Sequence, residues 1–108
     1  NVGLFFYAGP DQDTTWNEAR AWVKSLNLDG GGWRMPTMDE LESLYNKGAG
    51  RWNMTPLLKN TGWFVWSGED KNSSKARGFD FQLDFRGWSD RDRSFSKRAL
   101  AVRSRGDG

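Results

Sequence analysis

Two pairs of aspartates come nearest to a metal-binding pattern in this chain. Asp11 and Asp13 are two positions apart, as are Asp90 and Asp92, and alternate carboxylates are typical of calcium loops. Neither pair continues with the glycine and the terminal glutamate of an EF-hand loop. We therefore expect no metal site at either pair.

The residue types that several classes of enzyme require are missing. The chain contains no cysteine and no histidine. This excludes thiol nucleophiles, disulfides, zinc sites made of cysteine and histidine, and the histidine base of a Ser-His-Asp triad. Asp80 and Asp84 fall on one face of a predicted strand, but nothing in the sequence around them indicates a catalytic environment. We assign no catalytic residue and no cofactor, and we expect a protein that is not an enzyme.

Two tryptophans stand beside arginine in polar stretches that lack apolar periodicity. An exposed tryptophan beside an arginine is a common anchor for protein or glycan recognition. Together with the charged residues that follow the second tryptophan, they form the predicted ligand-binding set: Arg51, Trp52, Arg86, Trp88, Asp90, Arg91, Asp92 and Arg93. We expect loops over about 48–62 and 84–97 to present these side chains to a partner.

Positive charge is concentrated near the C-terminus. The segment 86–105 holds seven lysines and arginines against Asp90 and Asp92. Such a segment can form a positive surface that attracts sulfate, phosphate or carboxylate groups. The alternative is that these arginines pair with nearby acids on a solvated surface. We do not expect a nucleic-acid partner, because the basic residues fit no recognised module and are mixed with aspartate.

The length of 108 residues predicts a single domain over 1–108, and its abrupt start indicates the C-terminal part of a larger protein. No signal peptide or transmembrane segment is recognisable, so we expect no insertion into a membrane. The seven tryptophans are many for this length and can fill a sizeable core. Five of them are expected to pack inside: Trp16, Trp22, Trp33, Trp63 and Trp66.

Two capping boxes predict the helices. Thr15 and Glu18 open a helix over about 16–26, and Thr37 and Glu40 open a second helix over about 38–45. Apolar residues recur at three- and four-residue spacing in the first helix and predict one buried stripe: Trp16, Ala19, Trp22, Val23 and Leu26.

Apolar runs and alternation predict four strands, over residues 2–8, 63–67, 76–84 and 98–104. In the third strand Phe79, Phe81 and Leu83 alternate with polar residues, which is typical of a half-exposed antiparallel strand. Residues 48–62, 69–75 and 86–96 are expected to form turns or irregular segments. A strand, two helices and then a run of strands predict an α+β fold.

Four short motifs occur in one order along the chain. They are Trp16-x-x-Ala19-x-x-Trp22, Gly32-Trp33-Arg34-Met35-Pro36-Thr37-x-x-Glu40-Leu41, Val65-Trp66-Ser67 and Ala101-Val102-Arg103. In this combination the chain resembles the Lcl-type C-terminal domain of bacterial collagen-like adhesins over nearly its whole length. That family is related to the formylglycine-generating, sulfatase-modifying group within the C-type lectin-like superfamily.

The resemblance implies a C-type lectin-like fold, with two helices against antiparallel sheets, paired chain ends and a long loop region on one side. It does not carry over the oxidase activity of formylglycine-generating enzymes, which depend on active-site cysteines. It does not carry over calcium-dependent sugar binding either. The chain lacks Glu-Pro-Asn and Gln-Pro-Asp, and Trp16-Asn17-Glu18 falls inside a predicted helix.

The residues and the resemblance together favour a non-enzymatic binding or adhesion module, at the cell surface or outside a prokaryotic cell. Its expected partner is a cell-surface protein or an anionic, sulfated glycan. A sharper form of this hypothesis is a receptor diversified by a retroelement, with Gly87–Arg98 as the variable stretch. The alternative is a structural domain that oligomerises as a cap on a fibrous stalk. The sequence leaves the oligomeric state open.

Overall fold

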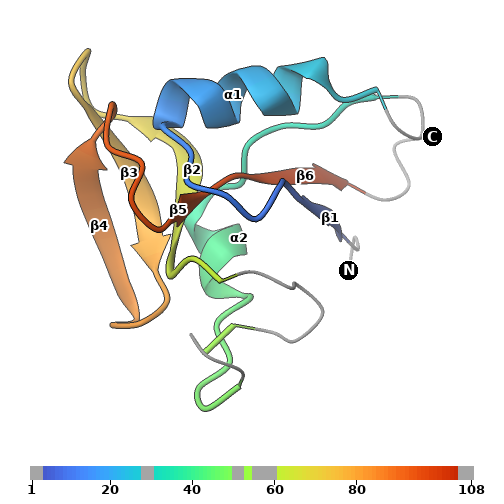
Figure 1. The fold of residues 1–108 in the computed structure, drawn as a ribbon. Coiled ribbons are helices and arrows are strands. Elements are labelled where there is room, and N and C mark those ends of the chain that lie inside the picture. The colour runs from blue at the N-terminus through green and yellow to red at the C-terminus, as the bar shows by residue number, and fades with distance from the viewer. Residues whose placement is uncertain (1–3, 28–30, 50–52, 55–60, 105–108) are drawn as a thin grey trace.

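The computed structural model describes residues 4–27, 31–49, 53–54 and 61–104, and they form two helices and six strands (Figure 1). In chain order these are β1 (Leu4–Ala8), α1 (Trp16–Ser25), α2 (Met38–Glu42), β2 (Phe64–Asp70), β3 (Lys75–Asp80), β4 (Phe85–Asp90), β5 (Lys97–Arg98) and β6 (Leu100–Ser104). This confirms the predicted α+β class. The finer assignment to a C-type lectin-like fold stays a prediction.

The strands form two sheets. A four-stranded sheet has the order β4-β3-β2-β5, in which β2 and β5 are parallel and the other neighbours antiparallel. A two-stranded sheet pairs β1 with β6, so that Leu4 lies opposite Ser104 and Ala8 opposite Leu100. The expected pairing near the two ends of the chain is therefore confirmed for the first and last strands, which lie side by side to the right of centre in Figure 1.

The helices begin where the capping boxes predict. The Thr15 hydroxyl accepts a hydrogen bond from the Glu18 N–H, and the Glu18 carboxylate accepts one from the Thr15 N–H. Thr37 and Glu40 make the same reciprocal bonds at the start of α2. Each box satisfies two backbone groups that a helix start would otherwise leave without partners.

The four-stranded sheet is covered on both faces, and each face has its own core. Side chains alternate along a strand, so Phe64 and Trp66 of β2 project to one face and Val65 to the other. The first face packs against α1, in a cluster that also contains Trp16, Ala19, Ala76 and Ala99. The second packs against α2, in a cluster that contains Met38, Leu41, Leu44, Met54, Phe79, Phe81 and Leu100.

Of the five tryptophans expected inside, two are fully enclosed. Trp16 and Trp66 are buried, and each donates its indole N–H to a backbone carbonyl. The other three are half-buried at the edges of the core: Trp22, Trp33 and Trp63. Trp22 stacks on Tyr7 of β1 with ring centres 5.9 Å apart.

The predicted strand over 76–84 is wrong in its second half. Strand β3 ends at Asp80, because the Asp80 carboxylate accepts the N–H groups of Gln82 and Leu83 and so forms a turn. Asp84 completes this turn with φ of 53°, a conformation that aspartate tolerates better than most residues. Leu83 consequently lies on the turn, 68% exposed, and not on an inner strand face.

The prediction of an irregular segment over 86–96 is wrong in its first half, because Phe85–Asp90 is strand β4. The predicted turn over 69–75 is shorter than expected, since β2 continues to Asp70 and β3 starts at Lys75. The strand expected over 98–104 is divided between β5 and β6. In each case the strand ends where its pairing with the neighbouring strand ends. The residues of one strand do not show which strand it will pair with, so the boundary could not be predicted from them.

Helix α2 is shorter than predicted and ends at Glu42. Leu44 and Tyr45 still reach the core, because the chain turns after the helix: Leu44 is buried, and Tyr45 meets Phe79 edge-to-face at 6.1 Å. Most of the expected irregular segment 48–62 lies outside the described residues. None of the described helices is long and apolar enough to cross a membrane.

A substitution at Gly78 tests the packing of the sheet against α1. A Cβ at this position would lie 2.3 Å from the Phe64 ring and 2.6 Å from the Val65 carbonyl oxygen. We expect Gly78→Ala to lower the free energy of unfolding by about 1–3 kcal/mol, because an extra carbon there overpacks the core. Denaturant unfolding measures the change.

The matched control is Gly87→Ala on the neighbouring strand, directly opposite Gly78 in the sheet. A Cβ there would meet nothing closer than the Phe85 ring at 3.4 Å. Its unfolding free energy should therefore stay close to that of the original protein. Equal losses in the two variants would contradict the packing argument.

Candidate functional site

Trp88 is an exposed aromatic side chain on β4, and two cations lie near its ring. Its side chain projects from the sheet face that α2 covers further along, and the residue is 46% exposed. Arg77, its direct neighbour across the β3–β4 pair, places its guanidinium carbon 5.2 Å from the ring centre. The Lys71 ammonium lies 5.9 Å away on the turn between β2 and β3. These distances are within the range of cation–π attraction.

A carboxylate completes this surface. Asp90 projects from the same strand face as Trp88 and forms ion pairs with Lys75 and with Arg93. The ammonium of Lys75 and then the guanidinium of Arg93 lower the pKa of Asp90 below its usual range. We call the surface made by Lys71, Lys75, Arg77, Trp88 and Asp90 the Trp88 face.

Arg86 shares the strand face of Trp88 but contacts α2. It donates hydrogen bonds to Asp39 at 2.6 Å and to Glu42 at 2.8 Å. The two carboxylates raise the pKa of Arg86. Arg86 therefore connects the sheet to the helix more than it offers charge to a ligand.

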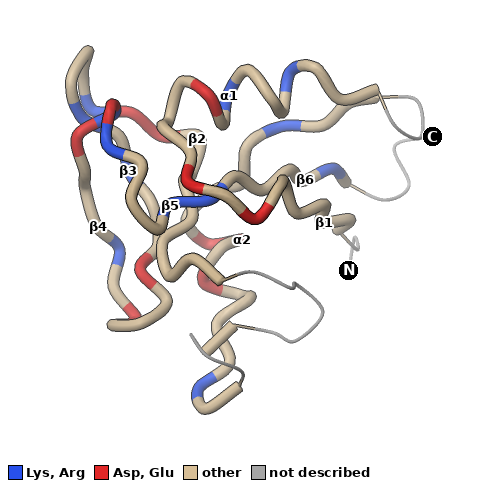
Figure 2. The backbone as a smooth tube through the Cα atoms, viewed as in Figure 1, with Lys and Arg blue, Asp and Glu red and all other residues tan. Residues whose placement is uncertain are grey.

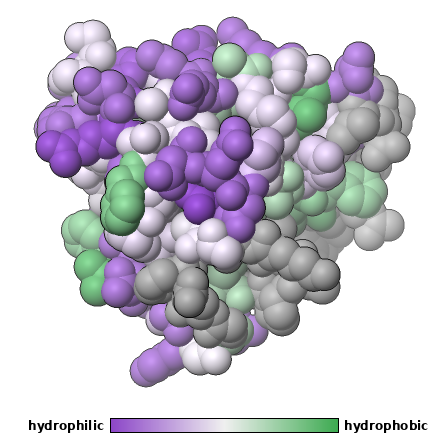
Figure 3. All heavy atoms as spheres, in the orientation of Figure 1, coloured by the Kyte–Doolittle hydropathy of each residue, from purple (hydrophilic) through white to green (hydrophobic). Residues whose placement is uncertain are grey.

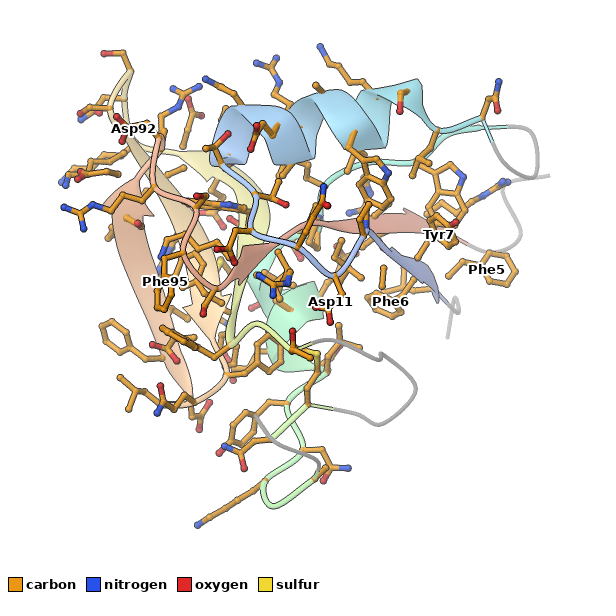
Figure 4. The ribbon with its side chains drawn as sticks, viewed as in Figure 1. Phe5, Phe6, Tyr7, Asp11, Asp92 and Phe95 are labelled. Carbon is orange, nitrogen blue, oxygen red and sulfur yellow. The ribbon has the colours of Figure 1, made fainter. Side chains whose placement is uncertain are left out.

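Arg91 turns to the opposite side of the sheet. Its guanidinium carbon lies 4.2 Å from the centre of the Trp16 ring, and its nitrogens bond Asp70 and Asn17. Asp92 lies on the turn after β4 at the upper left of Figure 4, beside a shallow hollow of about 320 Å³. The predicted set is thus split between two surfaces. Arg86, Trp88 and Asp90 project from one sheet face, and Arg93 pairs with Asp90 there. Arg91 turns to the other face.

Two predicted binding residues, Arg51 and Trp52, lie outside the described residues. The same is true of most of the first predicted binding loop, 48–62. The second loop, 84–97, is partly wrong, because half of it is strand β4.

Acids neutralise much of the charge in the described part of the basic C-terminal segment. Four of its arginines form ion pairs with carboxylates: Arg86, Arg91, Arg93 and Arg98. Lys97 instead lies 4.6 Å from the centre of the Phe64 ring, where burial and then the positive charge of Arg93 lower its pKa. Figure 2 shows basic and acidic residues close together at the upper left, around the turn between β2 and β3 and the turn after β4.

The carboxylates that suggested a calcium loop also have partners. Asp11 and Asp13 both bind the buried Arg98, at 2.8 Å each, and Asp11 also accepts from Thr61. Partial burial raises the pKa of Asp11, but the hydrogen bonds from Arg98 and Thr61 outweigh it and lower the pKa. In the part of the chain that the structure describes, no three acidic side chains lie close enough together to hold a metal ion.

Three exposed apolar side chains accompany β4 and were not predicted as surface residues. Leu83, Phe85 and Phe95 are 68%, 58% and 70% exposed, and we call them the apolar strip. Hydrophobic side chains gather on the left of the molecule in Figure 3, and Phe95 is labelled there in Figure 4. Phe95 meets Trp63 edge-to-face with ring centres 5.5 Å apart.

Sequence reasoning also missed the cations of the Trp88 face. Arg77 and Lys71 are 11 and 17 positions before Trp88, and they reach it only because β3 and β4 pair in one register. No local pattern marks them. The signal that could have found Arg77 is the hairpin itself, had the Asp80 turn been recognised.

Comparison with known proteins gives one family. The model of the Lcl C-terminal domain matches residues 6–103, which include both helices and nearly all strand residues. No curated protein matches the chain.

The lowered pKa of Asp90 gives a direct test of the Trp88 face. We expect Lys75→Gln to raise this pKa toward the ordinary value of about 3.9, because the strongest stabilising charge is removed. In the unaltered protein the carboxylate should stay ionised, and its ion pairs intact, until the pH falls below the usual aspartate range. Carbon-detected NMR titration of Asp90 measures both pKa values. Lys47→Gln, at an exposed lysine elsewhere, should leave the titration unchanged, and an unshifted curve in Lys75→Gln would rule out the ion pair.

Proposed function

The chain belongs to the Lcl C-terminal domain family, and on this premise we propose that it is a non-enzymatic module that binds a partner at the cell surface through the Trp88 face. The family match supports a C-terminal module. Adhesion, the extracellular location and the partner are our proposals. The superfamily relation to C-type lectin-like and sulfatase-modifying proteins remains an inference from resemblance.

The observation that carries the proposal is the exposed Trp88 with two cations near its ring. An indole buries a large area when a partner covers it, and it loses little conformational entropy because it has few rotatable bonds. Here Arg77 and Lys71 lie within cation–π distance of the ring, which favours one orientation of the side chain before binding. Tryptophan and arginine are the residue types most enriched among interface hot spots.

The charges around Trp88 favour a protein partner over a highly sulfated chain. A sulfated glycan binds best to a cluster of unpaired cations, because each neutralised charge releases a counterion. On the Trp88 face the cations alternate with acids: Lys75 pairs with Asp90, and Arg77 with Glu69. Such a mixed surface complements another mixed surface. Binding to a sulfated glycan is the alternative outcome of the binding measurements described below.

The retroelement hypothesis is compatible with this surface. Residues 87–98 cover the end of β4, the turn after it and β5, and they include Trp88 and Asp90. Variation at their exposed positions would alter the Trp88 face and leave both core clusters in place. A neighbouring reverse-transcriptase gene with a near-copy of this segment would support the hypothesis, and a genome without either would remove it.

Binding measurements on the purified domain test the proposal. The probes are an extract of cell-surface proteins and an array of neutral and sulfated glycans, with and without calcium, at low and raised salt. We expect Trp88→Ala to weaken the binding found at least about tenfold, because it removes the central aromatic anchor. Calcium should make no difference.

The matched control is Phe5→Ala. Phe5 has the same exposed fraction as Trp88, 46%, and lies at the other side of the molecule in Figure 4. Equal loss in both variants would point to general destabilisation. Full binding by Trp88→Ala would reject the Trp88 face as the binding surface.

A second function, self-association as a cap domain, is favoured by the apolar strip and the free edge of β4. Among the described strands, β4 is the last on its side of the sheet. Arg91 donates its backbone N–H to the Ser74 carbonyl on the β3 side. Backbone groups alternate in direction along a strand, so those of Arg86 and Trp88 point away from β3, toward the open edge. An open edge beside exposed apolar side chains can pair with a second copy.

Light scattering coupled to size exclusion tests this alternative. If the strip mediates association, Phe85→Ser with Phe95→Ser should convert oligomers into monomers, because both changes remove exposed apolar area. Lys47→Gln should leave the mass unchanged. A strictly monomeric protein at high concentration would exclude the cap function for this domain.

A further inference from the structure

A cleft on the α1 side of the sheet has the features of a second binding site. Its volume is about 450 Å³, within the range of small-molecule sites. Helix α1, the segment 33–35 and the end of β2 enclose it. Its lining residues are Trp16, Arg20, Val23, Lys24, Trp33, Arg34, Met35, Gly68 and Asp70. The Trp88 face lies on the opposite face of the sheet, so the two surfaces are separate.

One face of α1 supplies the first wall of the cleft. Its four lining residues recur at the i, i+4, i+7 and i+8 positions, which fall on a single side of a helix: Trp16, Arg20, Val23 and Lys24. Trp16 and Val23 are buried and form the apolar base of this wall. Arg20 and Lys24 are exposed and stand at its rim.

The opposite wall is fixed in position by backbone hydrogen bonds. Arg34 and Val102 exchange two bonds, of 2.9 Å and 2.8 Å, which attach this segment to β6. At its end, Gly68 donates to the Pro36 carbonyl at 2.9 Å. A Cβ on Gly68 would come within 3.3 Å of Met35, so glycine permits the close approach of β2 to this segment. The cleft is therefore formed before any ligand arrives.

The charge inside the cleft is positive. Arg34 is held by Glu40 in a two-bond ion pair, and Asp70 pairs with Arg91. Arg20 and Lys24 differ from them, because within the described residues neither forms an ion pair with a carboxylate. The guanidinium carbon of Arg20 lies 5.6 Å from the centre of the Trp16 ring. Two cations thus face the opening of a cleft with aromatic and aliphatic walls.

We propose that this cleft binds an organic carboxylate with an apolar or aromatic body. The carboxylate lies between Arg20 and Lys24 at the rim, where arginine can bind it through two hydrogen bonds. The body enters the cleft between the Trp33 ring and the buried side of α1. Such a group occurs on free small acids and at the C-terminus of a peptide, and the two sources share the same chemistry.

NMR titration of the whole domain tests the proposal. The probes are N-acetylphenylalanine, its amide, and a hexapeptide ending in phenylalanine with a free or an amidated C-terminus. We expect the two acids to shift the indole N–H signals of Trp16 and Trp33 saturably, and the amides to bind at least about tenfold more weakly. That factor corresponds to about 1.4 kcal/mol, a modest value for the loss of one charge-assisted contact.

The double variant Arg20→Gln/Lys24→Gln should bind the acids at least about tenfold more weakly and keep the dispersed spectrum of a folded protein. Lys47→Gln, at an exposed lysine outside the cleft, should bind like the original. If the peptide acid binds more tightly, the natural ligand is the C-terminus of a peptide chain. If the small acid binds more tightly, the natural ligand is a free small molecule. Acids and amides that bind alike, unshifted indole signals, or full affinity in the double variant would overturn the proposal.

Discussion

Two buried indole hydrogen bonds hold the architecture together. Trp16 donates to the Ser67 carbonyl at 2.9 Å, and Trp66 donates to the Thr14 carbonyl at 2.7 Å. The bonds run in opposite directions between the start of α1 and the centre of β2, so they fix both the distance and the rotation of the helix. A buried indole N–H or carbonyl without a partner costs about 1–3 kcal/mol, which makes other helix positions unfavourable. The backbone N–H of Trp16 also donates to the Arg91 carbonyl, which connects the helix to the turn after β4.

Both proposed binding surfaces depend on this connection, and they differ in how their charges are arranged. On the sheet and its turns, arginines are paired with acids, and the pairs join segments distant in sequence, as Arg98 does with Asp11 and Asp13. Paired charges position the chain but contribute little long-range potential. In the α1 cleft, Arg20 and Lys24 form no ion pair with a carboxylate of the described residues, so their charge is available to a ligand. The surface suited to a macromolecule is thus close to neutral, and the cleft suited to a small molecule is positive.

Local chemistry was sufficient to predict where the two helices start and the class of the fold. A capping box needs only residues three positions apart, so Thr15 and Thr37 could be recognised without any tertiary information. The hairpin of β3 and β4 was mispredicted, because alternation through Leu83 looked like one long strand. The Asp80 carboxylate ends that strand, and its bonds to the two following N–H groups compete with continued pairing.

The sequence by itself determined that the chain has no thiol or imidazole chemistry, that two capped helices precede a run of strands, and that Trp88 lies outside the apolar pattern. These are properties of composition and short spacing. Only the tertiary structure decided what surrounds each side chain. It placed Arg77 and Lys71 beside Trp88, turned Arg91 away to the Trp16 ring, and put Trp33 across a cleft from α1. These contacts follow from strand register and helix docking, which depend on pairing between distant segments.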